Sequence, residues 1–191
     1  MIKAICRWWF SLTGWTVYIA DNIDVERCVM VAAPHTSNYD GLLMVGAFSK
    51  ANIPMQFAIK QEWLRFPFKL LFKNLGAIGI DRSPLNPGEE RRSMVEVMTE
   101  LFTIQGTLTL VIAPEGSRSI RTKWRSGFYW VAKEAGVPIV LSYLDYETKR
   151  GGIEKLIYPT DYEKDMREIM EFYKEKTPRY PNKFSVDTRF L

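Results

Sequence analysis

The sequence predicts one α/β domain, in which a largely parallel mixed sheet has helices on both faces. Short apolar runs typical of strands alternate along the chain with segments of helical period, as in crossover connections between parallel strands. The 191 residues, 47% of them hydrophobic, suffice for one buried core and are few for two. Three polar clusters each follow a predicted strand, and ligands of open α/β sheets bind at the carboxyl ends of strands. We assign residues 23–191 to this domain.

Residues 1–22 are interpreted as a separate amphipathic segment. Apolar residues recur near helical spacing over residues 2–18, so this stretch suits a membrane interface and equally suits a helix packed on the domain. The apolar run from Trp8 to Ala20 is interrupted by polar residues and is shorter than the ~18 residues of a spanning helix. It also lacks a small-x-small cleavage site, so we expect neither a transmembrane helix nor a signal peptide.

The first predicted strand, Cys28 to Ala33, is continuously apolar, which is typical of a strand buried on both faces. A helix follows from Asp40 to Asn52, and Ser37 or Asn38 can cap it. Residues 55–59 form the next predicted strand.

A helix is predicted from Gln61 to Leu75, where aromatic and leucine side chains alternate with cations in a mixture that could touch a bilayer. The strand Ala77–Ile80 and a loop marked by Pro84 and Pro87 come next. The remaining predicted elements, in order, are a helix from Glu89 to Gln105, a strand from Leu108 to Ala113, a helix over 126–135, a strand from Val137 to Tyr143, a strand over 153–158 and a charged helix over 161–176.

His35, the only histidine, directly follows the first predicted strand. Asp40 stands five residues later, in the first turn of the next helix, where it could bond one ring nitrogen and leave the other to take a proton from a hydroxyl. A lone histidine is more often structural, and an acid at this position also suits the helix dipole. The context favours a His–Asp pair that acts by direct transfer, because no Gly-x-Ser-x-Gly elbow is present.

The other two clusters contain candidate binding residues. Arg82 and Arg118 each follow a strand and could grip a phosphate between them, although surface salt bridges are an equal alternative. Glu115 could hold an arginine in place, and backbone N–H groups of the turn around Gly116 could stabilise an oxyanion. Ser117 is best explained as a turn residue.

Composition narrows the function classes. Lys and Arg number 26 against 22 Asp and Glu, a mild excess that suits anionic lipids or phosphorylated substrates. Nucleic-acid binding is a weak alternative, because acids separate the basic residues and no binding motif is present. Cys6 and Cys28 lack the spacing of a disulfide framework or a zinc site, so we expect no metal and a reducing cytoplasm.

Four segments together resemble the ordered sequence blocks of the glycerophospholipid acyltransferase family, which includes lysophosphatidic acid acyltransferases. The segments are His35–Asp40, Gly76–Arg82, Pro114–Ser119 and Val137–Val140, and the resemblance covers about residues 28–145. It implies the fold of glycerol-3-phosphate acyltransferases and a catalytic pair of His35 and Asp40. It also implies substrate contacts from Arg82, Glu115, Gly116, Ser117, Arg118 and Pro138.

The resemblance further implies acyl-CoA or acyl carrier protein as donor, no metal or other cofactor, and a peripheral position on the cytoplasmic face of a membrane. The chain departs from better-known members, because Ala113 replaces a common Phe and Ser142-Tyr143 replaces a small or apolar pair. These changes leave the acceptor open. The simplest acceptor is 1-acylglycerol 3-phosphate, and the alternatives are a lyso-aminolipid acceptor or a lipid-binding protein of the same fold without catalysis.

Overall fold

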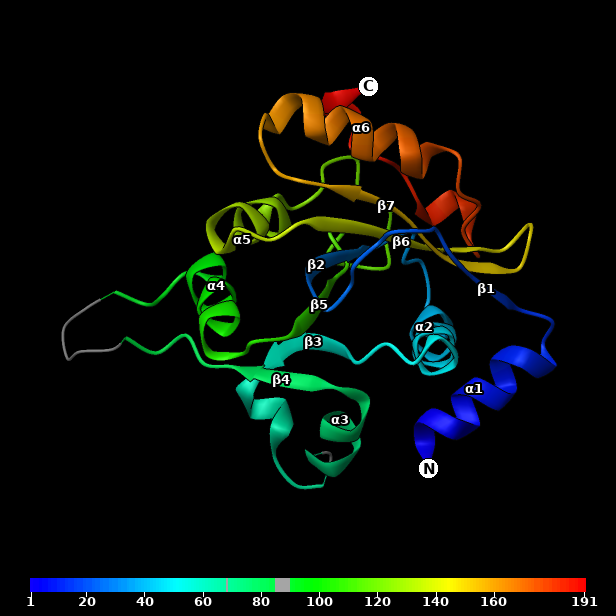
Figure 1. Cartoon of the computed structure of the whole chain (residues 1–191), viewed down its shortest axis with the longest axis horizontal. Helices are drawn as coiled ribbons and strands as arrows, with labels where there is room; N and C mark the ends of the chain where they lie inside the picture. The colour runs from blue at the N-terminus through cyan, green and yellow to red at the C-terminus, as the bar shows by residue number, and fades with distance from the viewer. Residues whose placement is uncertain (68, 85–89) are drawn as a thin grey trace.

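The structure is a computed structural model that describes residues 1–67, 69–84 and 90–191. These residues form a seven-stranded sheet with the order β1-β7-β6-β2-β5-β3-β4 (Figure 1). Strands β6, β2, β5, β3 and β4 are mutually parallel, whereas β7 is antiparallel to β6, and β1 is parallel to β7. The strands are β1 (Thr16–Ile19), β2 (Arg27–Ala32), β3 (Met55–Lys60), β4 (Ala77–Ile80), β5 (Leu108–Ile112), β6 (Ile139–Asp145) and β7 (Arg150–Ile157).

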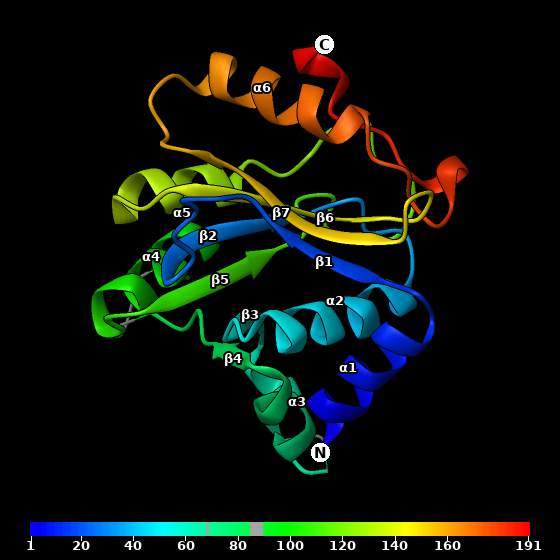
Figure 2. The ribbon, with the colours of Figure 1, turned by 45° about the vertical axis from the view of Figure 1, so that its right-hand side comes forward.

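Helices cover both faces of the sheet (Figure 2). Helices α1 (Ile2–Leu12) and α2 (Asn38–Ala51) lie on one face, with α3 (Lys69–Leu75) beside them. Helices α4 (Met94–Ile104), α5 (Gly127–Ala135) and α6 (Tyr162–Lys174) lie on the other. Short 3-10 turns span Gln61–Leu64, Pro181–Lys183 and Thr188–Phe190. The predicted α/β class, with a largely parallel mixed sheet between helices, is confirmed.

Strand β2 lies at the centre of the core. Val29 and Val31 belong to the apolar cluster that contains residues of α5 and α6, whereas Cys28 and Met30 belong to the cluster under α1 and α2. All four side chains are fully buried. The strand therefore contacts helices on both faces, which explains its uninterrupted apolar sequence.

The N-terminal segment of residues 1–22 contains a strand that the sequence did not predict. Residues 16–19 form β1, which pairs with β7, and α1 precedes it. Helix α1 packs closely on α2, because a Cβ atom at Gly46 would come within 2.6 Å of the Cys6 carbonyl oxygen. Among the described residues, no helix is both long and apolar enough to span a bilayer.

Two predicted helices have different limits in the structure. The helix expected from Gln61 to Leu75 is divided into a 3-10 turn and α3, with Pro67 between them, because proline lacks the backbone N–H that a continuous helix needs. The helix expected from Glu89 starts instead at Met94. Ser93 caps it by accepting the Glu96 N–H at 3.0 Å. Glu89 and Pro87 lie outside the described residues.

Candidate active site

The loop after β2 carries His35 into α2 through a capping box. Ser37 is the N-cap of α2, and its hydroxyl accepts the Asp40 N–H at 3.3 Å. In return, Asp40 Oδ2 accepts the Ser37 N–H at 2.8 Å. Because both bonds are local, the Ser-x-x-Asp spacing positions the carboxylate below His35.

The Asp40 side chain is 3% exposed and is surrounded by hydrogen-bond donors. Its Oδ2 also accepts the Thr36 N–H at 2.8 Å. Its Oδ1 accepts the Ser37 hydroxyl at 2.6 Å and the Tyr146 hydroxyl at 2.5 Å. Hydrogen bonds from several donors compensate this buried carboxyl group for its lost hydration.

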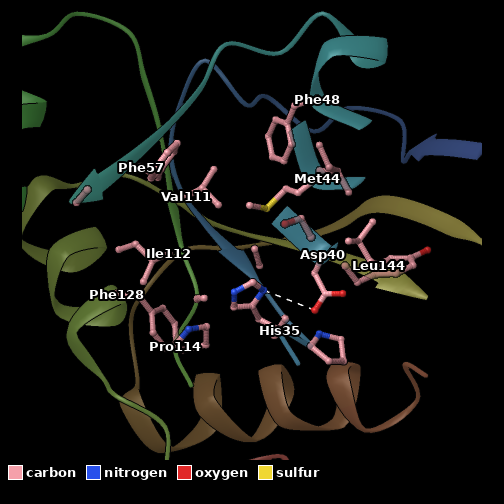
Figure 3. A pocket seen from close by; sticks show the side chains of 18 of the residues that line it. His35, Asp40, Met44, Phe48, Phe57, Val111, Ile112, Pro114, Phe128 and Leu144 are labelled. Atoms are coloured by element: carbon pink, nitrogen blue, oxygen red, sulfur yellow. Dashed lines mark ion pairs between the residues drawn. The ribbon is translucent and has the colours of Figure 1, made fainter. Parts of the chain in front are cut away.

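The imidazole of His35 lies beside this carboxylate (Figure 3). Its Nδ1 is 3.7 Å from Asp40 Oδ2, longer than a hydrogen bond and short enough to close on a small rotation of the ring. Burial lowers the pKa of His35, the charge of Asp40 opposes this change, and the charge of Arg118 lowers the pKa further. The imidazole is therefore neutral at neutral pH and can accept a proton.

Glu115 contacts the backbone of His35. The sequence suggested that it could hold an arginine, but none of the ion pairs between described residues includes it. Its Oε1 accepts the His35 N–H at 2.8 Å. The residue is 6% exposed, and its buried Oε2 has no hydrogen-bond partner among the described residues. Burial raises the pKa of this carboxyl to about 7.

A cavity of about 430 Å³ adjoins His35 and Asp40, and its walls are mainly apolar (Figure 3). One face of α2 contributes Met44, Ala47, Phe48 and Ala51, which recur at helical spacing from the end that carries Asp40 to the far end. The sheet, α4 and α5 supply the remaining walls. The arrangement places a polar pair beside a mainly apolar space.

The third polar cluster borders the same cavity. Gly116 lines it with φ +65°, and a Cβ atom there would come within 2.7 Å of Arg125 Nε. The Gly116 N–H donates to the Ala113 carbonyl at 3.2 Å, so this amide is engaged within the turn. The Ser117 hydroxyl accepts a hydrogen bond from Arg121 Nε at 3.1 Å, and Arg118 is exposed.

Of the six predicted binding residues, Gly116 lines the cavity and the other five do not. Arg82 follows β4 near the edge of the sheet, and its Nε donates to the Arg92 carbonyl at 2.7 Å. Pro138 precedes β6, where its carbonyl accepts the Val29 N–H at 3.0 Å. Strands β2 and β6 are parallel, and Ser142 pairs with Ala32. Pro138 therefore lies at the amino ends of the strands, whereas His35 lies at their carboxyl ends. Ser142, Tyr143 and Leu144 of the same strand line the cavity instead.

Two residues near the pair were not predicted. Tyr146 donates its hydroxyl to Asp40, and Arg179 places its guanidinium 4.3 Å from the centre of the Tyr39 ring. Both follow the last recognised sequence block, and contacts over more than a hundred residues leave no local pattern. Among the described residues, no three His, Cys, Asp or Glu side chains lie together as a metal site.

The chain is similar in sequence to known proteins. A family model described as Acyltransferase matches residues 14–144. Two curated proteins, each called "Probable 1-acyl-sn-glycerol-3-phosphate acyltransferase", are similar to the chain. The Mycoplasma pneumoniae protein is 34% identical over 124 residues, or 60% of this chain and 43% of the relative. The Mycoplasma genitalium protein is 29% identical over 143 residues, or 72% of this chain and 52% of the relative. The chain thus spans about half the length of these relatives.

The fold is also similar to a solved structure. The crystal structure of the 1-acyl-sn-glycerophosphate (LPA) acyltransferase PlsC from Thermotoga maritima superposes with a TM-score of 0.59. The match covers 91% of this chain and 75% of the PlsC chain, at 19% sequence identity. At that identity the similarity concerns the fold.

Proposed function

Because the chain belongs to the acyltransferase family, we propose that it transfers a fatty acyl group from a thioester donor to the free hydroxyl of 1-acylglycerol 3-phosphate. The observation that carries this proposal is the position of the His35–Asp40 pair at an apolar cavity of about 430 Å³. A base beside such a cavity can activate a hydroxyl next to a bound acyl chain. The names of the two Mycoplasma relatives support this acceptor.

His35 acts as the general base in this reaction. Its Nε2 takes the proton of the acceptor hydroxyl while the oxygen attacks the thioester carbonyl, and Asp40 stabilises the imidazolium that forms. When the tetrahedral intermediate collapses, the C–S bond breaks and the imidazolium returns the proton to the leaving thiolate. The neutral resting imidazole, which burial favours, suits the first of these steps.

The cavity is proposed to hold the transferred acyl chain. Its walls offer mainly apolar atoms from α2 and the sheet, and each methylene that leaves water contributes about 0.8 kcal/mol. The exposed cations Arg118, Arg121 and Lys123 follow the turn at Gly116 and can meet the phosphates of coenzyme A or of an acyl carrier protein. Acyl-CoA and acyl carrier protein both carry phosphate, so these cations suit either donor.

We further propose that α1 and the segment around α3 rest on the cytoplasmic surface of an anionic membrane. Ile5, Trp8 and Leu12 of α1 are 57%, 62% and 60% exposed, although Cys6 and Phe10 on the other face are buried. Phe66 and Leu70 are 95% and 75% exposed beside α3, which lies next to α1 (Figure 2). The exposed lysines and arginines among these apolar side chains suit anionic headgroups.

The test is acyl transfer in detergent micelles from labelled acyl-CoA and labelled acyl carrier protein to three acceptors. These are 1-acylglycerol 3-phosphate, a lyso-aminolipid and monoacylglycerol. Transfer to the first, reduced by about 10²-fold or more in His35→Ala, is the expected result. Thr107→Ala, exposed just before β5 and outside the predicted site, serves as the control for handling and stability.

Other outcomes overturn parts of the proposal. An unchanged rate in His35→Ala would exclude His35 as the base. Transfer only to the lyso-aminolipid would replace the proposed acceptor. Binding of lipid with no transfer from either donor would favour a lipid-binding protein of this fold.

A further inference from the structure

Arg179 lies beside the catalytic pair on a segment that follows the region matched by the family model. That region ends at residue 144, and Arg179 comes after α6. Its guanidinium is 4.3 Å from the centre of the Tyr39 ring and 5.4 Å from that of Tyr180. Tyr39 directly precedes Asp40, so the cation is stacked on the residue next to the catalytic carboxylate.

Hydrogen bonds on both sides of Arg179 fasten its segment to the active site. The Thr177 carbonyl accepts the Tyr146 N–H at 2.9 Å, and the Tyr146 side chain bonds Asp40. The Tyr180 N–H donates to the Thr36 hydroxyl at 3.3 Å, and Thr36 is the neighbour of His35. Arg179 is therefore held between two attachments to the residues that form the pair.

The guanidinium is available to an anion. Arg179 is exposed, and none of the ion pairs between described residues includes it. Stacking on Tyr39 occupies one face of the planar group and leaves the N–H donors along its edge free. A pre-oriented arginine edge binds phosphate oxygens in a bidentate manner. The sequence suggested Arg82 and Arg118 for this role. Arg82 donates instead to a backbone carbonyl away from the cavity, and Arg118 is exposed on the turn after β5.

We propose that Arg179, stacked on Tyr39 beside the His35–Asp40 pair, binds the phosphate of the acceptor lipid. This inference rests on the proposed acyl transfer and adds the residue that recognises the acceptor headgroup. A phosphate bound at Arg179 brings the attached glycerol to the residues next to the His35–Asp40 pair, because Tyr39 precedes Asp40 and Tyr180 bonds Thr36. The two halves of the site then come from different parts of the chain, with the base at the end of β2 and the phosphate ligand after α6.

The experiment measures equilibrium binding of 1-acylglycerol 3-phosphate and of monoacylglycerol with the same acyl chain, each in neutral detergent micelles with the full chain. Arg179→Gln should weaken binding of the phosphate-bearing lipid by about tenfold or more, and binding of the neutral lipid should not change. Arg179→Lys keeps the charge but loses the planar edge, so its affinity should lie between those of wild type and Arg179→Gln.

The matched control is Lys183→Gln. Lys183 is an exposed cation 4.8 Å from the Tyr180 ring, on the same segment but one aromatic ring further from the pair. Its removal should leave both affinities unchanged. Equal losses in Arg179→Gln and Lys183→Gln would show a general effect of positive charge and overturn the proposal, as would an unchanged affinity in Arg179→Gln.

The acyl-transfer assay on the same variants separates this proposal from the proposed reaction. Arg179-dependent binding without transfer by the wild type would refute the reaction and retain the phosphate site. Transfer by the wild type with an unchanged KM for 1-acylglycerol 3-phosphate in Arg179→Gln would refute the phosphate site and retain the reaction.

Discussion

Removal of the Tyr146 hydroxyl tests whether the Asp40 carboxylate must be held in a fixed orientation to assist His35. In Tyr146→Phe, the carboxylate loses a donor at 2.5 Å and keeps the Ser37 hydroxyl on the same oxygen. The ring itself stays in place, because it packs edge-on against Trp15 with a centroid distance of 4.9 Å. Tyr146 does not face the reacting atoms, so we regard it as a positioning residue.

The size of the effect follows from the kind of bond that is lost. A hydrogen bond to a charged group contributes about 1.5–3 kcal/mol, and the free energy of unfolding should fall by that order. If the transition state loses a similar amount because Asp40 stabilises the imidazolium less well, kcat/KM should fall by roughly tenfold to a hundredfold.

The pH profile distinguishes positioning from a structural role. Without the Tyr146 hydroxyl, Asp40 is less well oriented towards His35, and the charge of Asp40 acts to raise the pKa of His35. The pKa of His35 should therefore fall, and the acid limb of the kcat/KM profile should move to lower pH. The assay is acyl transfer to 1-acylglycerol 3-phosphate across the pH range, alongside denaturant unfolding.

Tyr129→Phe is the matched control. The Tyr129 hydroxyl donates to buried Asp165 at 2.8 Å, so the chemistry is the same but the location is between α5 and α6. This variant should lose stability with no change in kcat/KM or in the acid limb. If both variants lose stability and neither changes the kinetics, the reasoning about Tyr146 is refuted.

Three further predictions follow from other parts of the structure. Burial raises the pKa of Glu115 from 4.5 to about 7, so the folded state binds the extra proton and wild-type stability falls as pH rises between these values. Glu115→Gln keeps an acceptor for the His35 N–H and should gain stability relative to wild type as the pH rises over this interval. Urea unfolding of both proteins at pH 4.5 and at about pH 7 measures this gain. An equal change in the free energy of unfolding of the two proteins would contradict the prediction. Ala51→Leu, at the far end of the α2 face that lines the cavity, should shift the preferred acyl donor to shorter chains, by roughly fourfold in kcat/KM for each displaced methylene. A series of saturated acyl-CoA donors measures this shift, and an unchanged chain-length profile would place the acyl group elsewhere. Trp8→Ser combined with Leu12→Ser should lower binding to anionic vesicles by about a hundredfold or more, since each of the two side chains contributes about 1.5–3 kcal/mol when buried in lipid. Tyr158→Ser, also exposed but distant from α1, is the control in a vesicle sedimentation assay, and equal losses in both variants would argue against α1 as the contact.

Local patterns determined the parts of the site that depend on short spacings. The continuous apolar run of β2 required burial on both faces, and the structure places helices on both. The Ser37-x-x-Asp40 spacing required a capping box, which turns the carboxylate back towards His35. These interactions connect residues within a few positions of each other, so their energetics are encoded in adjacent residues.

Edge strands were harder to predict than central ones. Residues 16–19 follow α1 after a turn at Gly14, whose φ is +80°, and they form β1 by pairing with β7. The limit of α3 depended on Pro67, whose effect on the backbone outweighed the apolar period around it. In both cases hydrophobic periodicity was insufficient, because it shows neither the pairing of β1 with β7 nor the missing backbone N–H of Pro67.

The sequence by itself determined the alternation of strands and helices, the proximity of His35 and Asp40, and the position of Gly116 at the same end of the sheet. Only the tertiary structure decided that Glu115 supports the His35 backbone and that Arg82 and Pro138 do not line the cavity. It also decided that Tyr146 bonds Asp40 and that Arg179 lies over the Tyr39 ring. The physical reason is the range of the interactions. A capping box or a buried strand is specified by neighbours in the chain, whereas strand order and register decide which distant side chains meet, and these depend on the packing of the whole sheet.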